Sequence, residues 1–252
     1  MSDLEAQQQE TGLPPLYSEL VPINSETHAG YSLRARRSYG YAAAEVSLPL
    51  NAAEFTRAAL SYPIVFAATT PSFPIAILGV SKGINLFVDE EGNWLHGTYV
   101  PAYARRYPFF LAKQTDGDKF ALCVDRNEEI FEQSDREPLL SDGEPTPALK
   151  NAMEFCQNYY KAQTLTQQVV ESFEKLDLLI ERQVSIDTVG GEKMRIGGFK
   201  MIDDEKFKAL PPELLSEWRD RDILMLIYAH KLSQENWSRL VERHAQRTAV
   251  KS

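Results

Sequence analysis

The residues best suited to binding chemistry gather in one segment, which runs from Thr98 to Phe110. It holds five aromatic residues, two arginines and two prolines within thirteen positions, and Trp94 and His96 come just before it. Aromatic rings beside guanidinium groups can stack on a ligand while the guanidinium groups pair with its carboxylates. The sequence therefore predicts a binding site for a ligand or partner here. Its candidate residues are Trp94, His96, Tyr99, Tyr103, Arg105, Arg106 and Tyr107.

The same segment also has a structural interpretation. Large aromatic residues are often part of a hydrophobic core, and arginines beside them can form salt bridges with acidic residues elsewhere in the chain. Pro101 and Pro108 prevent a helix from running through the segment and favour extended or turning backbone. A second, weaker candidate site, for which a solvated basic strand face is the alternative, consists of Tyr31, Arg34, Arg36, Arg37, Tyr39 and Tyr41.

Catalytic and metal-binding motifs give no comparable signal. The sequence has no G-x-S-x-G turn, no P-loop and no G-x-G-x-x-G after a predicted strand. Its four histidines, which lack the spacing of a zinc site, are His28, His96, His230 and His244. We expect no metal and no cofactor from these patterns.

Composition and charge restrict the class of partner. The formal net charge of −9 argues against nucleic acid, because such proteins cluster lysine and arginine to contact phosphates. The uncharged run from Ser61 to Ser81 contains three prolines, so it is not predicted to span a membrane. Cys123 and Cys156 both lie in apolar surroundings and are predicted to be buried free thiols. Residues 1–9 lack the basic and apolar parts of a secretion signal, so we expect a cytoplasmic protein.

The elements that position these residues change character along the chain. Residues 13–144 are punctuated by Pro, Gly, Asn and Asp, which indicates short strands. Within them we predict buried strands at 64–66 and 75–78, a hairpin from 84–88 to 94–95 with its turn at 89–93, and a strand at 119–124 entered through residues 116–118. A short helix is predicted to begin with Asn51 as its N-cap and Glu54 at its third position.

Residues 145–252 are predicted to be mainly helical with one hairpin. Thr146 and Pro147 indicate a helix start, followed by apolar residues at helical spacing to about 160 and again from about 167 to 180. Strands are predicted around 184–189 and 194–196, with Gly190 and Gly191 at the turn. Helices are expected at 203–210, 213–219 and 222–244, the last with an interruption near Ser233.

We therefore predict an α+β fold with an antiparallel or mixed sheet in its first half and a helix-rich second half. Residues 1–12 are polar and are expected to form a disordered tail. Residues 13–252 contain no Gly/Ser-rich linker, so a single domain is expected, in which the hairpin near Gly190 returns to the sheet of the first half.

With these residues in view, the chain resembles the SapC-like family of soluble bacterial proteins, and it does not resemble the peptide-transport permease of the same name. The resemblance covers about residues 14–240. Its matching residues are 15–17, 20–24, 28, 41–43, 46, 49–50, 54–55, 62–66, 83, 85–89, 99–103, 105–109, 123–125, 145–147, 155–156, 198–199 and 228–230. The resemblance implies proximity to nutrient-uptake or surface-protein systems, because family members tend to be encoded near TonB-dependent receptors, tryptophan-halogenase-like proteins and cupin-like proteins. It supplies no catalytic residues.

Three functions remain open from the sequence. The first is a non-catalytic accessory module that binds a protein or peptide partner through residues 94–110. The second is an enzyme or enzyme component acting on a peptide or small aromatic substrate; its candidate residues are His96, Tyr103, Arg105, Arg106 and Asp125. The third is a surface-layer-related structural protein. A homo-oligomer is compatible with each of them.

Overall fold

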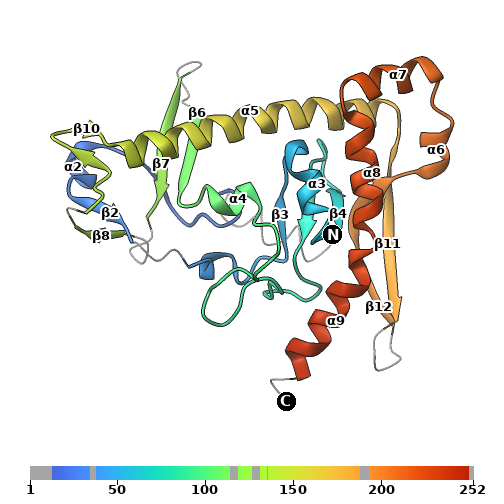
Figure 1. The fold of residues 1–252 in the computed structure, drawn as a ribbon, viewed down its shortest axis with the longest axis horizontal. Coiled ribbons are helices and arrows are strands. Elements are labelled where there is room, and N and C mark those ends of the chain that lie inside the picture. The colour runs from blue at the N-terminus through green and yellow to red at the C-terminus, as the bar shows by residue number, and fades with distance from the viewer. Residues whose placement is uncertain are drawn as a thin grey trace.

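Two antiparallel sheets lie along one long helix in the computed structural model, which describes residues 13–34, 38–113, 119–126, 131–134, 136–187 and 193–249 (Figure 1). The helix is α5 (Pro147–Lys175), and it contacts strands of both sheets. The smaller sheet contains, in spatial order, β1 (Leu20–Pro22), β7 (Phe120–Asp125) and β6 (Phe109–Lys113). The larger sheet contains β11 (Leu179–Asp187), β12 (Lys193–Ile202), β4 (Ile64–Ala67), β5 (Pro74–Ile77) and β3 (Ser47–Pro49).

Two small strand pairs and several short helical turns complete the first half of the chain. Two small antiparallel pairs are formed by β2 (Tyr31–Leu33) with β8 (Phe131–Gln133), and by β9 (Leu140–Ser141) with β10 (Glu144–Pro145). The short helical turns are α2 (Ser25–His28), η1 (Gly40–Ala42), η2 (Ala52–Glu54), α3 (Phe55–Ala58) and α4 (Ala102–Arg105). The predicted α+β class is confirmed, with sheets in the first half and helices concentrated in the second.

Several local predictions in the first half are confirmed. Strands β4 and β5 pair within the uncharged run at 61–81, as predicted. No helix in the described ranges is both long and apolar enough to cross a bilayer. The Glu54 carboxylate accepts a hydrogen bond from the Asn51 backbone, as the predicted capping box requires. Strand β7 forms as expected, whereas its entry turn at 116–118 and the tail at 1–12 lie outside the described residues.

The predicted hairpin at 84–95 is wrong, because residues 84–88 and 94–95 form only an isolated bridge between Val88 and Trp94. The Asn85 amide donates to the carbonyl of Ala42, and its carbonyl oxygen accepts from the backbone of Phe87. Arg247 donates to the carbonyls of Asn85 and Val88 from the far end of the chain. Side chains therefore satisfy backbone groups that a ladder would otherwise have paired. The turn after Val88 is present, since the Asp89 carboxylate accepts from the Asn93 backbone.

The second half differs from the prediction mainly in the extent of its elements. Helix α5 begins at Pro147 as predicted, but it runs unbroken through the polar residues between the two predicted segments. It ends before Asp177, whose left-handed φ of 53° turns the chain, so Leu179 and Ile180 belong to β11 and not to a helix. The hairpin β11–β12 pairs with β4, which confirms that it returns to the sheet of the first half. Its turn at 188–192 lies outside the described residues.

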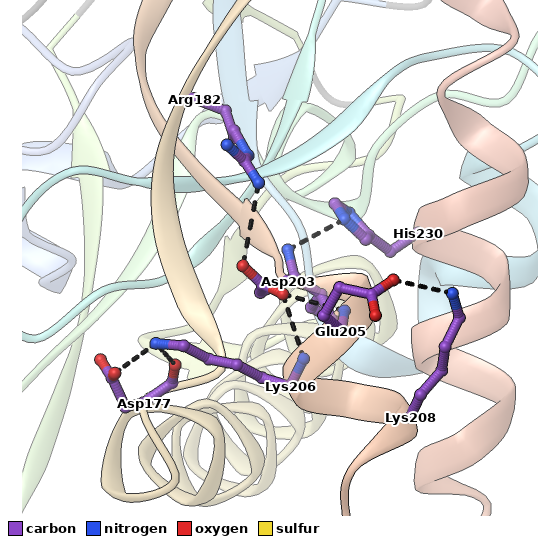
Figure 2. Close-up of polar contacts among 8 residues, drawn as sticks. Asp177, Arg182, Asp203, Glu205, Lys206, Lys208 and His230 are labelled. Carbon is purple, nitrogen blue, oxygen red and sulfur yellow. Dashed lines mark hydrogen bonds and ion pairs between the residues drawn. The ribbon is translucent and has the colours of Figure 1, made fainter.

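The C-terminal helices pack against the large sheet and bind the backbone at the ends of two of its strands, β4 and β12. They are α6 (Asp204–Lys208), α7 (Pro212–Asp220), α8 (Ile223–Ser233) and α9 (Asn236–Ala249), and the predicted interruption near Ser233 is confirmed. Asp203 caps α6 by accepting from the backbones of Glu205 and Lys206, and the His230 ring on α8 accepts from the Ile202 backbone at 3.3 Å (Figure 2). The other ring nitrogen of His230 donates to the carbonyl of Ile64 at 2.8 Å. One buried side chain thus links α8 to both β4 and β12.

Buried side chains from both halves share one hydrophobic core. Phe66 on β4 packs edge-on against Phe173 on α5, and Phe173 packs in turn against Trp218 on α7. Phe199 on β12 stacks on Trp237 on α9. A second, smaller cluster lies where the first half of α5 meets the small sheet; it includes Phe109, Val124 and Cys156. Cys123 and Cys156 are buried free thiols, as predicted.

Candidate functional site

The 94–110 segment forms one short helix, which lies between its two prolines. Proline is tolerated at a helix start, and Pro101 precedes helix α4. The backbone N–H of Ala102, at the start of this helix, donates to the Glu54 carboxylate at 2.6 Å. As predicted, no helix runs through both prolines, and residues 102–105 form a single helical turn whose first N–H is bound by a carboxylate from a distant turn.

Two of the predicted site residues, Trp94 and Tyr107, are buried in the hydrophobic core. The Trp94 indole is buried and donates to the Tyr62 hydroxyl at 3.0 Å. The Tyr107 hydroxyl donates to the buried Asp125 carboxylate at 2.7 Å, and its ring stacks on that of Tyr41. These contacts agree with the structural interpretation of the aromatic residues, and they give Asp125 a structural role as well.

Arg105 is exposed and is held in one orientation by its neighbours. Its Nε donates to the Val100 carbonyl and its Nη2 to the Tyr99 hydroxyl, both at 3.1 Å. Tyr99 in turn donates to Glu54 at 3.0 Å. Burial raises the pKa of the Glu54 carboxyl, although its hydrogen bonds act in the opposite direction. This relay fixes the Arg105 guanidinium, and no described carboxylate forms an ion pair with it, so its charge remains available to a ligand.

Arg106 is the most unusual residue of the segment, because its side chain is buried and no acidic side chain in the described part of the chain pairs with it. The residue is 8% exposed, and its guanidinium lies over four aromatic rings, those of Tyr17, Tyr103, Phe110 and Tyr159. Among the described residues no carboxylate forms an ion pair with it, and its buried Nε has no hydrogen-bond partner. A guanidinium stays protonated at neutral pH, so the charge persists.

The rings around Arg106 do not compensate this charge by ionising. Burial raises the pKa of Tyr103 to about 12, and it raises the pKa of Tyr159 still further. Both phenols are therefore neutral at physiological pH. Buried charges are normally paired, because removing them from water is expensive. The uncompensated guanidinium thus indicates a place for an anion.

Arg106 lies at the wall of an open pocket of about 830 Å³. Two further guanidinium groups, those of Arg105 and Arg136, line it together with one acidic residue, Glu137. We call this the arginine pocket. Counted over the lining residues that the structure describes, three arginines and one acid give a charge of about +2 at neutral pH.

The N-terminus of helix α5 opens into the same arginine pocket, through Thr146, Pro147 and Ala148. The first N–H groups of a helix have no partner inside it, and they carry the positive end of the helix dipole. The Thr146 hydroxyl does not cap them, since it donates to the Pro138 carbonyl at 2.6 Å. Backbone and side chains therefore both favour an anion at this position.

The other predicted residues lie elsewhere. His96 is exposed in a turn and is absent from the lining of the arginine pocket. In the weaker candidate, Arg34 and Tyr31 line a different pocket, where Arg34 pairs with Glu132 at 3.9 Å. Tyr39 packs on Trp94 instead, and Arg36 and Arg37 lie outside the described residues.

Three residues important to the site were not predicted. Tyr17 and Tyr159 contribute rings to the cage around Arg106, and Arg136 contributes the third cation. Tyr159 lies four residues after Phe155, so helical spacing alone could have suggested that both face the same surface of α5. Arg136 lies in an irregular segment with no local pattern that would have revealed it.

The fold and the site define an α+β protein with a caged, uncompensated arginine beside the N-terminus of a long helix. The chain belongs to the SapC family, whose model matches residues 23–240. This match confirms the family that the sequence resembles. No curated protein and no solved structure matches the chain.

Proposed function

We propose that this chain is a non-catalytic accessory protein that captures an acidic segment of a protein or peptide partner in the arginine pocket. The observation that carries the proposal is the Arg106 guanidinium, buried without an acidic partner at the wall of the pocket. A carboxylate from a partner would compensate this charge. It would also meet the exposed guanidinium of Arg105 and the free N–H groups of helix α5.

The size and lining of the pocket favour a peptide over a single small ion. A volume of about 830 Å³ accommodates several residues' side chains, whereas an inorganic anion would leave most of it empty. Phe109 and Phe155 supply apolar surface, and Asn151 supplies an amide that can bind peptide backbone. The Arg105 guanidinium lies over the Phe155 ring, 5.3 Å from its centroid, so a cation and an apolar surface are presented side by side.

The biological setting of the proposal comes from the family resemblance. Proximity to nutrient-uptake and surface-protein systems suggests a partner from such a system, and the two buried free thiols are compatible with a reducing cytoplasm. An acidic protein with a local basic pocket would attract an acidic segment at that pocket and repel acidic surfaces elsewhere.

Fluorescence anisotropy with a labelled acidic hexapeptide, which contains glutamate and one phenylalanine, tests this proposal. Saturable binding is expected, together with weaker binding as salt rises. The same peptide with glutamine in place of glutamate should bind at least about tenfold more weakly, because each lost charged hydrogen bond contributes about 1.5–3 kcal/mol.

A double variant identifies the pocket. The double variant Arg105→Ala/Arg136→Ala should bind the acidic peptide about tenfold more weakly, or weaker still. Arg219→Ala with Arg221→Ala is the matched control, because it removes the same charge from exposed arginines on and after helix α7. Equal weakening in both variants, or no binding of the acidic peptide at all, would contradict the proposal.

A further inference from the structure

Arg106 also lines a second, smaller pocket of about 240 Å³. Four prolines form part of its wall, at positions 14, 15, 49 and 74, and we call it the proline pocket. Its aromatic walls include Tyr103 and Tyr159, which also cage Arg106. The proline pocket thus shares one cation with the arginine pocket but has different neighbours.

Two residues that line the proline pocket each carry a buried donor that has no hydrogen-bond partner among the described residues. One is the Nε of Arg106, and the other is the side-chain nitrogen of Gln167 on helix α5. Buried donors are almost always hydrogen-bonded, and leaving one unpaired is unfavourable by about 1–3 kcal/mol. Two such groups lining one pocket indicate a ligand that supplies acceptors.

The nearby polar groups do not fill this role. The Thr166 hydroxyl donates to the Ala162 carbonyl at 2.7 Å and accepts from the Ala52 backbone at 2.8 Å. The Tyr103 hydroxyl donates to the Pro15 carbonyl. Of the fourteen described residues that line the pocket, none is acidic and only Arg106 is a cation. The missing acceptor should therefore carry negative charge.

The dimensions and walls of the pocket restrict the body of that ligand. An apolar cavity of about 150 Å³ is known to hold benzene, and pockets for drug-sized ligands begin near about 300 Å³. The proline pocket lies between these sizes. Phe73, Phe110 and the proline rings offer flat apolar surfaces, which suit a single ring or a short branched chain.

We infer that the proline pocket binds a small organic carboxylate with a flat apolar body, whose carboxylate lies between Arg106 and Gln167. This ligand is distinct from the acidic segment proposed for the arginine pocket. Because Arg106 lines both pockets, a bound small acid would compete with that segment for the same guanidinium.

Benzoate and its neutral counterpart benzamide are the probes. Isothermal titration of the full chain should show one saturable site for benzoate and at least about tenfold weaker binding of benzamide. The Nε–Hε resonance of Arg106 should move during the benzoate titration in a nitrogen-proton correlation spectrum. Absence of benzoate binding, or equal binding of both probes, would overturn the inference.

Variants at Gln167 avoid disturbing the buried arginine. Gln167→Met removes the donor while keeping a side chain of similar volume, and it should lower the affinity for benzoate by about tenfold. Gln167→Glu supplies a carboxylate from the chain itself, so it should abolish benzoate binding and raise the melting temperature. Gln168→Met, at the exposed neighbouring position, is the matched control and should bind as the wild type does.

The Arg105→Ala/Arg136→Ala variant separates the two pockets. It should leave benzoate affinity within about twofold of the wild type, because both arginines lie in the arginine pocket and act at long range only. If it weakens benzoate as strongly as Gln167→Met does, benzoate binds in the arginine pocket and this inference fails. If acidic peptides do not bind but benzoate does, the proposed function fails and this inference stands.

Discussion

The guanidinium of Arg106 lies over the ring of Tyr159 on helix α5, with its Cζ 4.4 Å from the ring centroid. This contact joins the 94–110 segment to the helical half of the chain. It places a permanent charge against a neutral ring, where most proteins place a carboxylate. The rings hold the charge in position without neutralising it, so the guanidinium can pair with a bound anion.

Replacing Arg106 should separate binding from stability. Cation–π contacts contribute about 0.5–2 kcal/mol each, and the burial of the unpaired charge opposes them. We therefore expect Arg106→Met to change the free energy of unfolding by less than about 1 kcal/mol while removing binding of the acidic peptide and of benzoate. Urea unfolding and the two binding assays check this. A loss of about 3–5 kcal/mol, typical of a broken buried ion pair, would show that Arg106 is structural.

Glu54 should be required for the shape of the site. Its carboxylate accepts from the backbones of Asn51 and Ala102 and from the Tyr99 hydroxyl, so Glu54→Ala leaves three donors without this partner. We expect a loss of about 3 kcal/mol in urea unfolding. Glu45→Ala is the control, since burial also raises the pKa of Glu45 but its side chain accepts no hydrogen bond from the described residues. Equal losses in the two variants would contradict this role.

His230 should make stability depend on pH. Burial lowers its pKa to about 4 from an ordinary value of 6.5. The hydrogen bond to the Ile64 carbonyl and the charge of Asp204 raise this pKa by less, and the charge of Lys231 lowers it slightly further. The unfolded chain therefore binds the proton more readily, and stability should fall by up to about 3 kcal/mol as pH drops from about 6.5 to about 4. His230→Gln should flatten this dependence in urea unfolding at several pH values, whereas His96→Gln, at an exposed position, should not. An unchanged slope in His230→Gln would refute the assignment.

Asp125 should behave as a structural residue and not as a catalytic one. Its buried carboxylate accepts from the backbones of Ser18 and Glu19 at 2.8 and 2.9 Å and from the Tyr107 hydroxyl. Asp125→Ala should thus lower the free energy of unfolding by about 3 kcal/mol, and Tyr107→Phe by about 1 kcal/mol. A fully stable Asp125→Ala protein would return Asp125 to the list of functional candidates.

The sequence predicted the elements whose signals are local. The Asn51–Glu54 capping box, the Thr146–Pro147 helix start and the interruption after Ser233 all depend on residues a few positions apart. The predicted hairpin at 84–95 is absent because the Asn85 backbone N–H donates to the Ala43 carbonyl and the Asn85 carbonyl accepts from Arg247, and no local pattern connects these residues. Tertiary contacts of this kind override strand propensity.

In the site, too, residues with a local sequence signal were predicted and residues brought in by packing were not. Arg105 and Arg106 were predicted because they stand beside aromatic residues in the sequence, and they line the arginine pocket. Arg136 and Gln167 reach the two pockets only through the packing of the chain, so composition could not identify them. The sequence also could not show that Arg106 lacks an acidic partner, since that depends on every residue folded around it.

The most direct test of the central claim is native mass spectrometry of the tagged protein, drawn gently from its own cells. We expect additional mass equal to that of a polypeptide that contains an acidic segment. This mass should be present with the wild type and with Arg219→Ala/Arg221→Ala, and lost with Arg105→Ala/Arg136→Ala. A bare mass for the wild type, or a polypeptide that stays bound to Arg105→Ala/Arg136→Ala, would contradict the claim that the arginine pocket captures a partner.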